Sequence, residues 1–388
     1  MTFDIIEMPP FRDKSKILFV LPASAIGGAE TKTFNLLRSL NIFTKILITH
    51  SSILDFYSEL EVKKYAFEDF GCKNPSVFSM KNILAYSRAI KKITDYEKPD
   101  IVLGIMHTGA LFVTFANDLF FLKVPSVVTI EGNISAYFNS IGRGPTLKEQ
   151  LLLKYCFSRA KSIIVPSEGI RNDLVNNFNV SGKKIKKIYN GIDIGSLFKY
   201  SKEKISLTKD CPWIITACRL NNQKDFVTLL KAFKIIREKT EAKLLIIGDG
   251  ELKEEIIKLS IELSVNGDVI MPGFQKNPFK YISKGDVFVL SSFYEGFGNV
   301  IVEAMAFGIP VVSTNCPSGP EEIINDGENG FLVSVKDYEK MAEKCLSIIT
   351  DDGLKKTLSK NAMKRAEDFS IDKMEKEYKD YLMEFTAR

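Results

Sequence analysis

Short apolar runs, bounded by polar residues or glycines, recur along the first half of the chain, and segments with a helical spacing of apolar residues separate them. The runs predict buried strands, and their alternation with helices predicts a parallel sheet that helices cover on both faces. The expected strands are residues 16–21, 45–48, 101–105, 126–130 and 162–165. The expected helices are residues 29–40, 81–93, 110–122 and 147–160.

The second half repeats this alternation after a lysine-rich, non-periodic stretch at 199–209, which is typical of a linker. The expected strands are residues 212–218, 243–247, 269–271, 287–290, 310–313 and 331–333. The expected helices are 225–239, 251–263 and 321–325, and only helix is expected from Asp337 onward, ending at 371–385. The pattern therefore predicts an α/β protein of two doubly wound, Rossmann-like domains that face each other across a cleft.

Composition narrows the class of protein. The 388 residues suit two domains, and no stretch of 18 or more apolar residues suggests a transmembrane helix. Residues 1–10 lack the features of a secretory signal, and the six cysteines are scattered without a Cys-x-x-Cys pair, so we expect a cytoplasmic protein with reduced thiols. Because His50 and His107 are the only histidines and no Asp-x-Asp occurs, we expect neither a His-rich metal site nor a Mg²⁺ ion held on a diphosphate.

Basic residues gather between positions 143 and 187. Ten lysines and arginines face only three acidic residues there, which gives this segment a net charge of +7. The basic residues are Arg143, Lys148, Lys154, Arg159, Lys161, Arg171, Lys183, Lys184, Lys186 and Lys187. Such a segment can dock on an anionic leaflet at roughly 1 kcal/mol for each cation, or simply be a solvated face. Nucleic acid is not an expected partner, because Tyr155 and Phe157 are not interleaved as a stacking platform.

Candidate ligand-binding residues follow the predicted strands of the first half. Gly27 and Gly28 lie in the loop after strand 16–21, a place where doubly wound folds bind ligands, although a tight turn without a ligand is the alternative. The loop lacks Gly-x-Gly-x-x-Gly, so no dinucleotide fingerprint is present. A lone histidine is more often structural, but His107 follows a strand end, and Glu131 ends the next strand in the same way.

The most informative stretch of the second half is 291–303. An apolar run leads into a glycine-bearing turn with Glu295, and a helical pattern with Glu303 follows. Two carboxylates so placed, beside the free N–H groups of a helix N-terminus, can contact different parts of a polyhydroxylated ligand. Arg219 and Lys224 begin the same half, and two fixed cations can stabilise a departing diphosphate. Solvated loops with surface charges are the alternative for both groups.

In combination these residues resemble the retaining glycosyltransferases of family 4, of the GT-B type, across nearly the whole chain. The matching motifs are the loop Gly27-Gly28-Ala29-Glu30, the boundary Ile188-Tyr189-Asn190-Gly191-Ile192-Asp193, Cys218-Arg219-Leu220 with Lys224, and Glu295 and Glu303 separated by seven residues, with Gly296, Phe297 and Gly298 in place. One departure is Cys218, which stands where the family commonly has glycine.

The resemblance implies roles for these residues. Arg219 and Lys224 would bind the donor diphosphate and stabilise the leaving group. Glu303 would bind the ribose, Glu295 the donor sugar, and His107 matches the family's active-site histidine. The expected catalytic residues are therefore His107, Arg219, Lys224 and Glu295. The rest of the expected donor site is Gly27, Gly28, Gly250, Gly273, Phe274, Gly296, Phe297, Gly298, Asn299, Val300 and Glu303.

The resemblance also implies an activity. A hexose or N-acetylhexosamine would be transferred, with retention, from a nucleotide sugar to a glycan or polyprenyl-diphosphate-linked acceptor. UDP is the expected nucleotide, and no metal or other cofactor is expected. A front-face route is favoured, with Glu131 kept as a possible nucleophile. The stretch 316–323 looks like bacterial members that build surface polysaccharides or lipid-linked oligosaccharides. Docking of segment 143–187 on the cytoplasmic face of the inner membrane would bring the enzyme to such an acceptor.

The implied domains are an acceptor-binding domain at 1–195, a donor-binding domain at 196–370 and a final helix at 371–388 that crosses back to the first domain. Two alternatives on the same architecture stay open, a non-catalytic nucleotide-sugar-binding subunit and a nucleotide-sugar epimerase or phosphorylase. The presence of only two histidines argues against an epimerase. The missing Gly-x-Gly-x-x-Gly argues against a nicotinamide oxidoreductase.

Overall fold

The computed structural model describes residues 14–73, 78–140 and 142–386, and the expectation about a secretory signal at 1–10 lies outside them. Its first half forms a parallel seven-stranded sheet in the order β3-β2-β1-β4-β5-β6-β7. The strands are β1 Lys16–Val20, β2 Thr44–Thr49, β3 Lys63–Ala66, β4 Ile101–Ile105, β5 Ser126–Thr129, β6 Ser162–Val165 and β7 Ile185–Lys187. The helices of this half are α1 Gly28–Ser39, α2 Met80–Glu97, α3 Met106–Phe120, α4 Ile134–Ser140, α5 Leu147–Arg159 and α6 Glu168–Phe178.

The second half forms a parallel six-stranded sheet in the order β10-β9-β8-β11-β12-β13. Its strands are β8 Trp213–Ala217, β9 Lys243–Ile247, β10 Val269–Gly273, β11 Val287–Leu290, β12 Val311–Thr314 and β13 Gly330–Val333. Its helices are α8 Phe226–Arg237, α9 Lys253–Glu262, α10 Phe279–Ile282, α11 Asn299–Ala306, α12 Pro320–Ile323, α13 Tyr338–Thr350 and α14 Asp352–Ala366. Helix α7, Ile194–Ser201, follows the first crossing between the domains.

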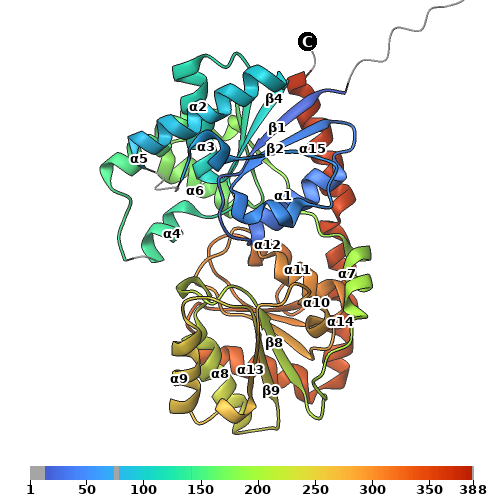
Figure 1. Cartoon of the computed structure of the whole chain (residues 1–388). Helices are drawn as coiled ribbons and strands as arrows, with labels where there is room; N and C mark the ends of the chain where they lie inside the picture. Colours follow the sequence, from blue (N-terminus) through green and yellow to red (C-terminus); the bar gives the residue numbers. More distant parts are fainter. Residues whose placement is uncertain (1–13, 74–77, 141, 387–388) are drawn as a thin grey trace, which may run out of the picture.

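Helices cover both faces of each sheet, and for this reason the strands read as continuous apolar runs (Figure 1). In β1, Ile17 and Phe19 pack on the side of α1, whereas Leu18 and Val20 pack on the side of α2 and α3. Trp213, in the central strand β8, is fully buried in the same manner. The expected fold class, two doubly wound Rossmann-like domains, is confirmed.

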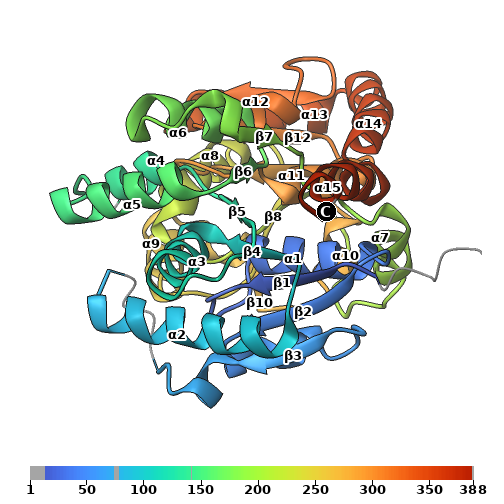
Figure 2. The ribbon, with the colours of Figure 1, turned by 90° about the horizontal axis from the view of Figure 1, so that it is seen from above.

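The chain crosses between the domains twice, and the two crossings lie side by side. Ile192 accepts a backbone hydrogen bond from Ile371 and donates one to Phe369. Beyond this crossing, α15 (Ile371–Thr386) packs against α1 and buries Met374, Tyr378 and Leu382 in the core of the first domain. Figures 1 and 2 show α15 lying along that domain, so the C-terminal helix joins the two halves.

The structure differs from the sequence-based elements in a few places. Strands β3 and β7 were not expected, because both are edge strands whose lysines hide the apolar run of a central strand. Helix α4 was also missed. Helix α3 begins at Met106 rather than at residue 110, and α7 occupies the first residues of the expected linker at 199–209.

Candidate functional site

The loops after β1 and β8 meet where the two domains touch, a contact zone called the domain seam below. Arg219, after β8, donates from Nη2 to the carbonyl oxygen of Ile26 at 3.0 Å. A Cβ atom on Gly27 would lie 3.1 Å from the same nitrogen, so the glycine loop and the guanidinium are in close contact. Gly27 of the predicted glycine loop and the predicted cation Arg219 are 192 positions apart in the sequence. They are nevertheless neighbours in the structure.

The loop that carries Arg219 rests on the two glycines after β9. Gly248 has a φ of +143°, and a Cβ there would lie 1.9 Å from the Cys218 carbonyl oxygen. A Cβ on Gly250 would lie 2.3 Å from the Leu220 carbonyl oxygen. These two glycines let their backbone lie directly against the loop that carries Arg219. The contact fixes the backbone from which the Arg219 side chain projects.

Lys224 and Glu295 form an ion pair across 71 positions of sequence. Lys224 Nζ lies 2.5 Å from Glu295 Oε1, and the Ser292 hydroxyl donates to the same oxygen at 2.6 Å. Burial by itself would lower the pKa of Lys224, but the charge of Glu295 and the hydrogen bond between them outweigh that effect and raise it. The pair is thus charged on both sides and held at the end of β11.

The turn after Glu295 crosses the domain seam. A Cβ on Gly296 would lie 1.9 Å from the Glu131 carbonyl oxygen, and the Ser167 hydroxyl donates to the Gly296 carbonyl at 2.7 Å. Gly298 has a φ of +97° and is the N-cap of α11. Asn299, the first residue of α11, accepts from Asn190 of the first domain at 2.9 Å. Phe297 is buried against Tyr189 and Phe369, so the turn is anchored from both domains.

Glu303 lies in the second turn of α11 and is buried. Unlike Glu295, its carboxylate has no hydrogen bond or ion pair among the residues that the structure describes. Burial therefore raises its pKa to about 7. A buried carboxylate without a partner is costly to keep, and such groups concentrate at sites that bind ligands.

His107 lies in the first turn of α3, directly after β4. Strand and helix join without a loop, and Met106 takes a φ of +66°, which costs energy for a side chain of this kind. Gly109 permits the tight junction, since a Cβ there would lie 2.8 Å from the Val20 carbonyl oxygen. Burial lowers the pKa of His107 to about 4, so the imidazole is neutral at pH 7. Its ring has no hydrogen-bond partner within the described part of the chain.

Four other predicted site residues lie outside the network of contacts described above. Gly28 begins α1 and faces open space. Gly273 ends β10 with a φ of +76°, also beside open space, and the next residue, Phe274, is 66% exposed. Val300 is half-buried in the first turn of α11. None of these four residues is tied by a side-chain bond to Arg219, Lys224 or Glu295 in the described coordinates.

Sequence reasoning missed the partner of Glu131. Lys32 of α1 places Nζ 2.9 Å from both carboxylate oxygens of Glu131, and both side chains are buried. The Lys32 ammonium also lies 5.5 Å from the centre of the Tyr378 ring of α15. Burial would lower the pKa of Lys32, but Glu131 raises it overall. The sequence did carry one signal for this buried pair, a lysine among the core-facing positions of the predicted helix 29–40.

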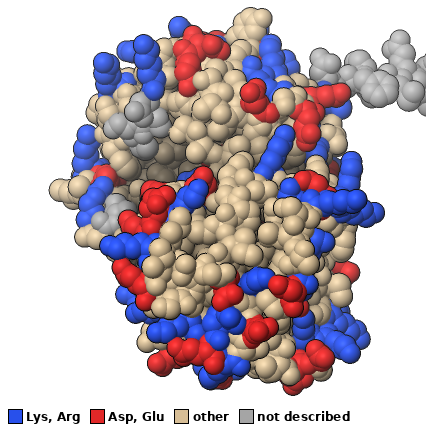
Figure 3. All heavy atoms as spheres, turned by 60° about the horizontal axis from the view of Figure 1, so that its bottom comes forward, with Lys and Arg blue, Asp and Glu red and all other residues tan. Residues whose placement is uncertain are grey.

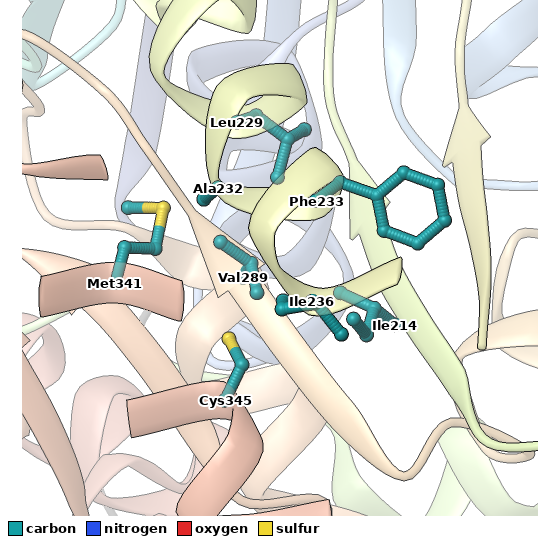
Figure 4. A pocket seen from close by; sticks show the side chains of 8 residues that line it. All are labelled: Ile214, Leu229, Ala232, Phe233, Ile236, Val289, Met341 and Cys345. Atoms are coloured by element: carbon teal, nitrogen blue, oxygen red, sulfur yellow. The ribbon is translucent and has the colours of Figure 1, made fainter. Parts of the chain in front are cut away.

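The apolar space in Figure 4 lies away from the seam. Side chains of α8 and α13 face Ile214 of β8 and Val289 of β11 there, and no room for a water molecule remains between them. Within the described residues no cluster of three or more His, Cys, Asp or Glu could hold a metal ion, and no helix is long and apolar enough to cross a membrane.

Comparisons with known proteins bear on the family and the fold of this chain. The family model for Glycosyltransferase Family 4 matches residues 26–196, and the model for Glycosyl transferases group 1 matches residues 199–365. A Campylobacter jejuni enzyme, N-acetylgalactosamine-N,N'-diacetylbacillosaminyl-diphospho-undecaprenol 4-alpha-N-acetylgalactosaminyltransferase, is 35% identical over 259 residues, 67% of each chain. An uncharacterized glycosyltransferase of Methanocaldococcus jannaschii is 29% identical and covers 88% of this chain and 93% of its own.

The fold is shared with the Anabaena protein HepE, solved in complex with UDP and glucose. Its TM-score is 0.81 at 19% identity, and the match covers 95% of this chain and 100% of HepE. The two facing domains thus define a GT-B glycosyltransferase. The chain belongs to glycosyltransferase family 4.

The unpaired Glu303 makes a testable prediction about stability. The folded protein holds this proton up to about pH 7, whereas a glutamate in the unfolded chain has an ordinary pKa of 4.5, so burial of the carboxylate lowers the stability of the wild type as pH rises between these values. We expect Glu303→Gln to raise the free energy of unfolding by about 3 kcal/mol at pH 8 and by less than about 1 kcal/mol at pH 5. Urea unfolding at both pH values measures this.

The exposed carboxylate of Glu254 on α9 supplies the control, because Glu254→Gln should change neither value appreciably. An equal rise in the free energy of unfolding for Glu303→Gln at both pH values would show that the burial of charge at Glu303 does not cause the rise.

Proposed function

We propose that the protein transfers a hexose or N-acetylhexosamine from a UDP-sugar, with retention, to a glycan or a polyprenyl-diphosphate-linked acceptor in bacterial polysaccharide synthesis. The observation that carries this proposal is the approach of the Arg219 guanidinium to the Gly27 loop across the seam. Residues 1–195 would bind the acceptor and 196–370 the donor, while 371–388 returns to the first domain. The Campylobacter relative is named for a diphospho-undecaprenol acceptor, and HepE was solved with UDP and glucose, which supports the choice of partners.

The leaving diphosphate carries negative charge, which nearby positive groups must stabilise. Arg219 can bind its oxygens with two parallel hydrogen bonds, and Lys224 can bridge Glu295 and the phosphate. The N-terminus of α11, capped by Gly298, adds its positive end. Three fixed sources of positive charge can stabilise the diphosphate without a metal ion, and the proposal predicts that a chelator leaves turnover unchanged.

The two glutamates would hold hydroxyl groups. Glu295 is already ionised and fixed by Lys224, so it can accept hydrogen bonds from the donor sugar. Glu303 would accept from the ribose, whose hydroxyl donors favour the ionised form and lower its pKa on binding. His107 is neutral and can donate a hydrogen bond to the donor sugar without adding charge.

Retention requires either a front-face route or a protein nucleophile. Glu131 was the candidate nucleophile, but both its oxygens accept from the Lys32 ammonium in a buried pair. A carboxylate so neutralised is a weak nucleophile. The pairing supports the front-face route, in which the leaving phosphate takes the proton of the acceptor hydroxyl.

A first experiment tests the activity itself. UDP release from a panel of UDP-hexoses and UDP-N-acetylhexosamines, with and without EDTA, should show turnover of at least one donor, and the same donor should raise the melting temperature. Glu303→Ala should weaken donor binding, whereas His107→Ala should mainly lower kcat. Binding without turnover across the panel would favour the non-catalytic subunit, and equal loss of both quantities in each variant would count against the assigned roles.

A second experiment tests the role of Glu131. The double variant Lys32→Met with Glu131→Gln removes both charges of the pair together, so no buried charge is left alone. We expect its kcat to stay within about tenfold of the wild type, because the residues around the reacting centre keep their positions. A loss of more than about 10⁴-fold would instead identify Glu131 as the nucleophile.

The single variant Glu131→Gln controls for folding. It leaves the Lys32 ammonium buried without a partner, and we expect a loss of stability of about 3–5 kcal/mol that the double variant does not share.

Docking on a membrane is a further part of the proposal. Segment 143–187 is less basic than its net charge of +7 indicates, because two acidic residues outside it pair with its cations: Asp118 with Arg159, and Glu322 with Lys187. Within the segment, Arg143 pairs with Glu149 and Arg171 with Glu168. Figure 3 shows basic and acidic side chains intermingled on the face of the molecule that it displays. Charge alone therefore gives a weaker case for docking than the sequence indicated.

Helix α5 offers the better surface. Leu147, Leu151 and Tyr155 are exposed at helical spacing, and Lys148 and Lys154 lie on the same helix without an ion pair in the described structure. An exposed apolar ridge with free lysines is suited to the boundary of an anionic lipid leaflet. We propose that α5 holds the enzyme at the cytoplasmic face of the inner membrane.

Co-sedimentation with phosphatidylglycerol vesicles at low salt tests this docking. Lys148→Glu with Lys154→Glu should reduce the bound fraction at least fivefold, since roughly 1 kcal/mol is lost for each lysine. Lys356→Glu with Lys360→Glu, two exposed positions one turn apart on α14, makes the same change of charge and should reduce it far less. Equal reductions would show that net charge, and not α5, governs binding.

A further inference from the structure

A shallow, open hollow of about 290 Å³ lies at the domain seam, beside the proposed donor site. Residues of α4 and α6 form two of its sides, and Pro317 of the second domain borders it. In Figure 1, α4 extends from the first domain toward the second on the left of the view, with α6 next to it. The volume is near the lower end of the range for ligand pockets, roughly 300 Å³.

Amide side chains dominate the lining. Asn139 of α4 and Asn172 and Asn176 of α6 are exposed, and their side chains have no hydrogen-bond partner among the described residues. An amide offers donors and an acceptor from one side chain, which suits the neighbouring hydroxyl groups of a sugar ring. Asn172 and Asn176 are four positions apart, so they lie on one face of α6.

The hollow presents little charge to a ligand. Its one carboxylate, Asp173, is buried and already occupied: Oδ2 accepts from the backbone N–H groups of Ile134 and Ser135 at 3.0 and 3.2 Å, and Oδ1 accepts from Asn177 at 2.8 Å. These bonds fix the start of α4 against α6. The site therefore favours a neutral polyhydroxylated ligand over an anion or a metal ion.

Contacts across the domain seam connect the hollow to the loop that carries Glu295. Asn133 donates to Ser318 Oγ across the seam at 3.0 Å. The carbonyl oxygen of Pro317, a lining residue, accepts from the backbone N–H of Glu295 at 3.2 Å. The wall of the hollow is thus one hydrogen bond away from the loop proposed to hold the donor sugar.

We propose that this hollow, which we name the asparagine hollow, binds a neutral sugar residue of the acceptor glycan beyond the residue that reacts. This inference rests on the proposed function, because it needs a glycan acceptor at the same seam. A sugar bound there contacts both domains, so it favours the arrangement of the domains seen here and selects acceptors that already carry more than one sugar.

The test uses two neutral trisaccharides, tri-N-acetylchitotriose and maltotriose, titrated by ligand-observed NMR against the full chain saturated with UDP. Saturation with UDP separates the asparagine hollow from the donor site. We expect at least one trisaccharide to bind, and the variant Asn172→Ala with Asn176→Ala to raise its Kd at least about fivefold through the loss of two amide partners. Asn266→Ala, an exposed asparagine of the second domain, is the matched control and should leave Kd unchanged.

Thermal melting of the double variant checks that it is folded, and alanine is favourable on α6. Should that variant melt early, Asn139→Ala on α4 replaces it with the same expectation. Unchanged Kd values in the asparagine variants, or no binding of either trisaccharide by the wild type, would overturn the inference. The UDP-sugar panel decides the proposed function separately, since it uses neither trisaccharide.

Discussion

The contact between Gly296 and the Glu131 carbonyl is the constraint on which the site depends. A Cβ atom at Gly296 would lie 1.9 Å from that oxygen, so any other residue would push the domains apart. The loop after β11 carries Glu295 and the N-terminus of α11, and it reaches the first domain because glycine lets two backbones touch. The bonds from Ser167 to the Gly296 carbonyl and from Asn190 to Asn299 depend on this approach.

The other side of the same contact is fixed by the buried pair of Lys32 and Glu131. Lys32 projects from α1 and lies under the Tyr378 ring of α15. The residue that meets Gly296 is therefore held by the first helix of the chain, which in turn packs on the last. Because removing one member of a buried pair leaves an uncompensated charge, this network resists change at either end. The geometry of the seam is thus coupled to the packing of the C-terminal helix.

The sequence predicts much of this arrangement, and its failures have physical causes. Central strands such as β1 are buried on both faces, so their apolar runs are visible, whereas the edge strands β3 and β7 carry lysines and are not. Motif spacing identified Lys224 and Glu295 as separate candidates. Their direct contact joins residues 71 positions apart, and no local pattern encodes such a contact. Lys32 was overlooked because one lysine on a core-facing helix position does not alter the period of the helix.

The two glutamates of the motif, Glu295 and Glu303, have different electrostatic environments. Glu295 comes before the helix, where Lys224 and Ser292 reach it, so its charge is compensated before any ligand arrives. Glu303 lies in the second turn of α11, where burial without a partner raises its pKa to about 7. A ligand that donates hydrogen bonds would therefore compensate the charge of Glu295 little further, but that of Glu303 strongly. Under the proposed function, hydroxyl donors of the ribose would thus recover at Glu303 the energy that the burial of its carboxylate costs the free protein.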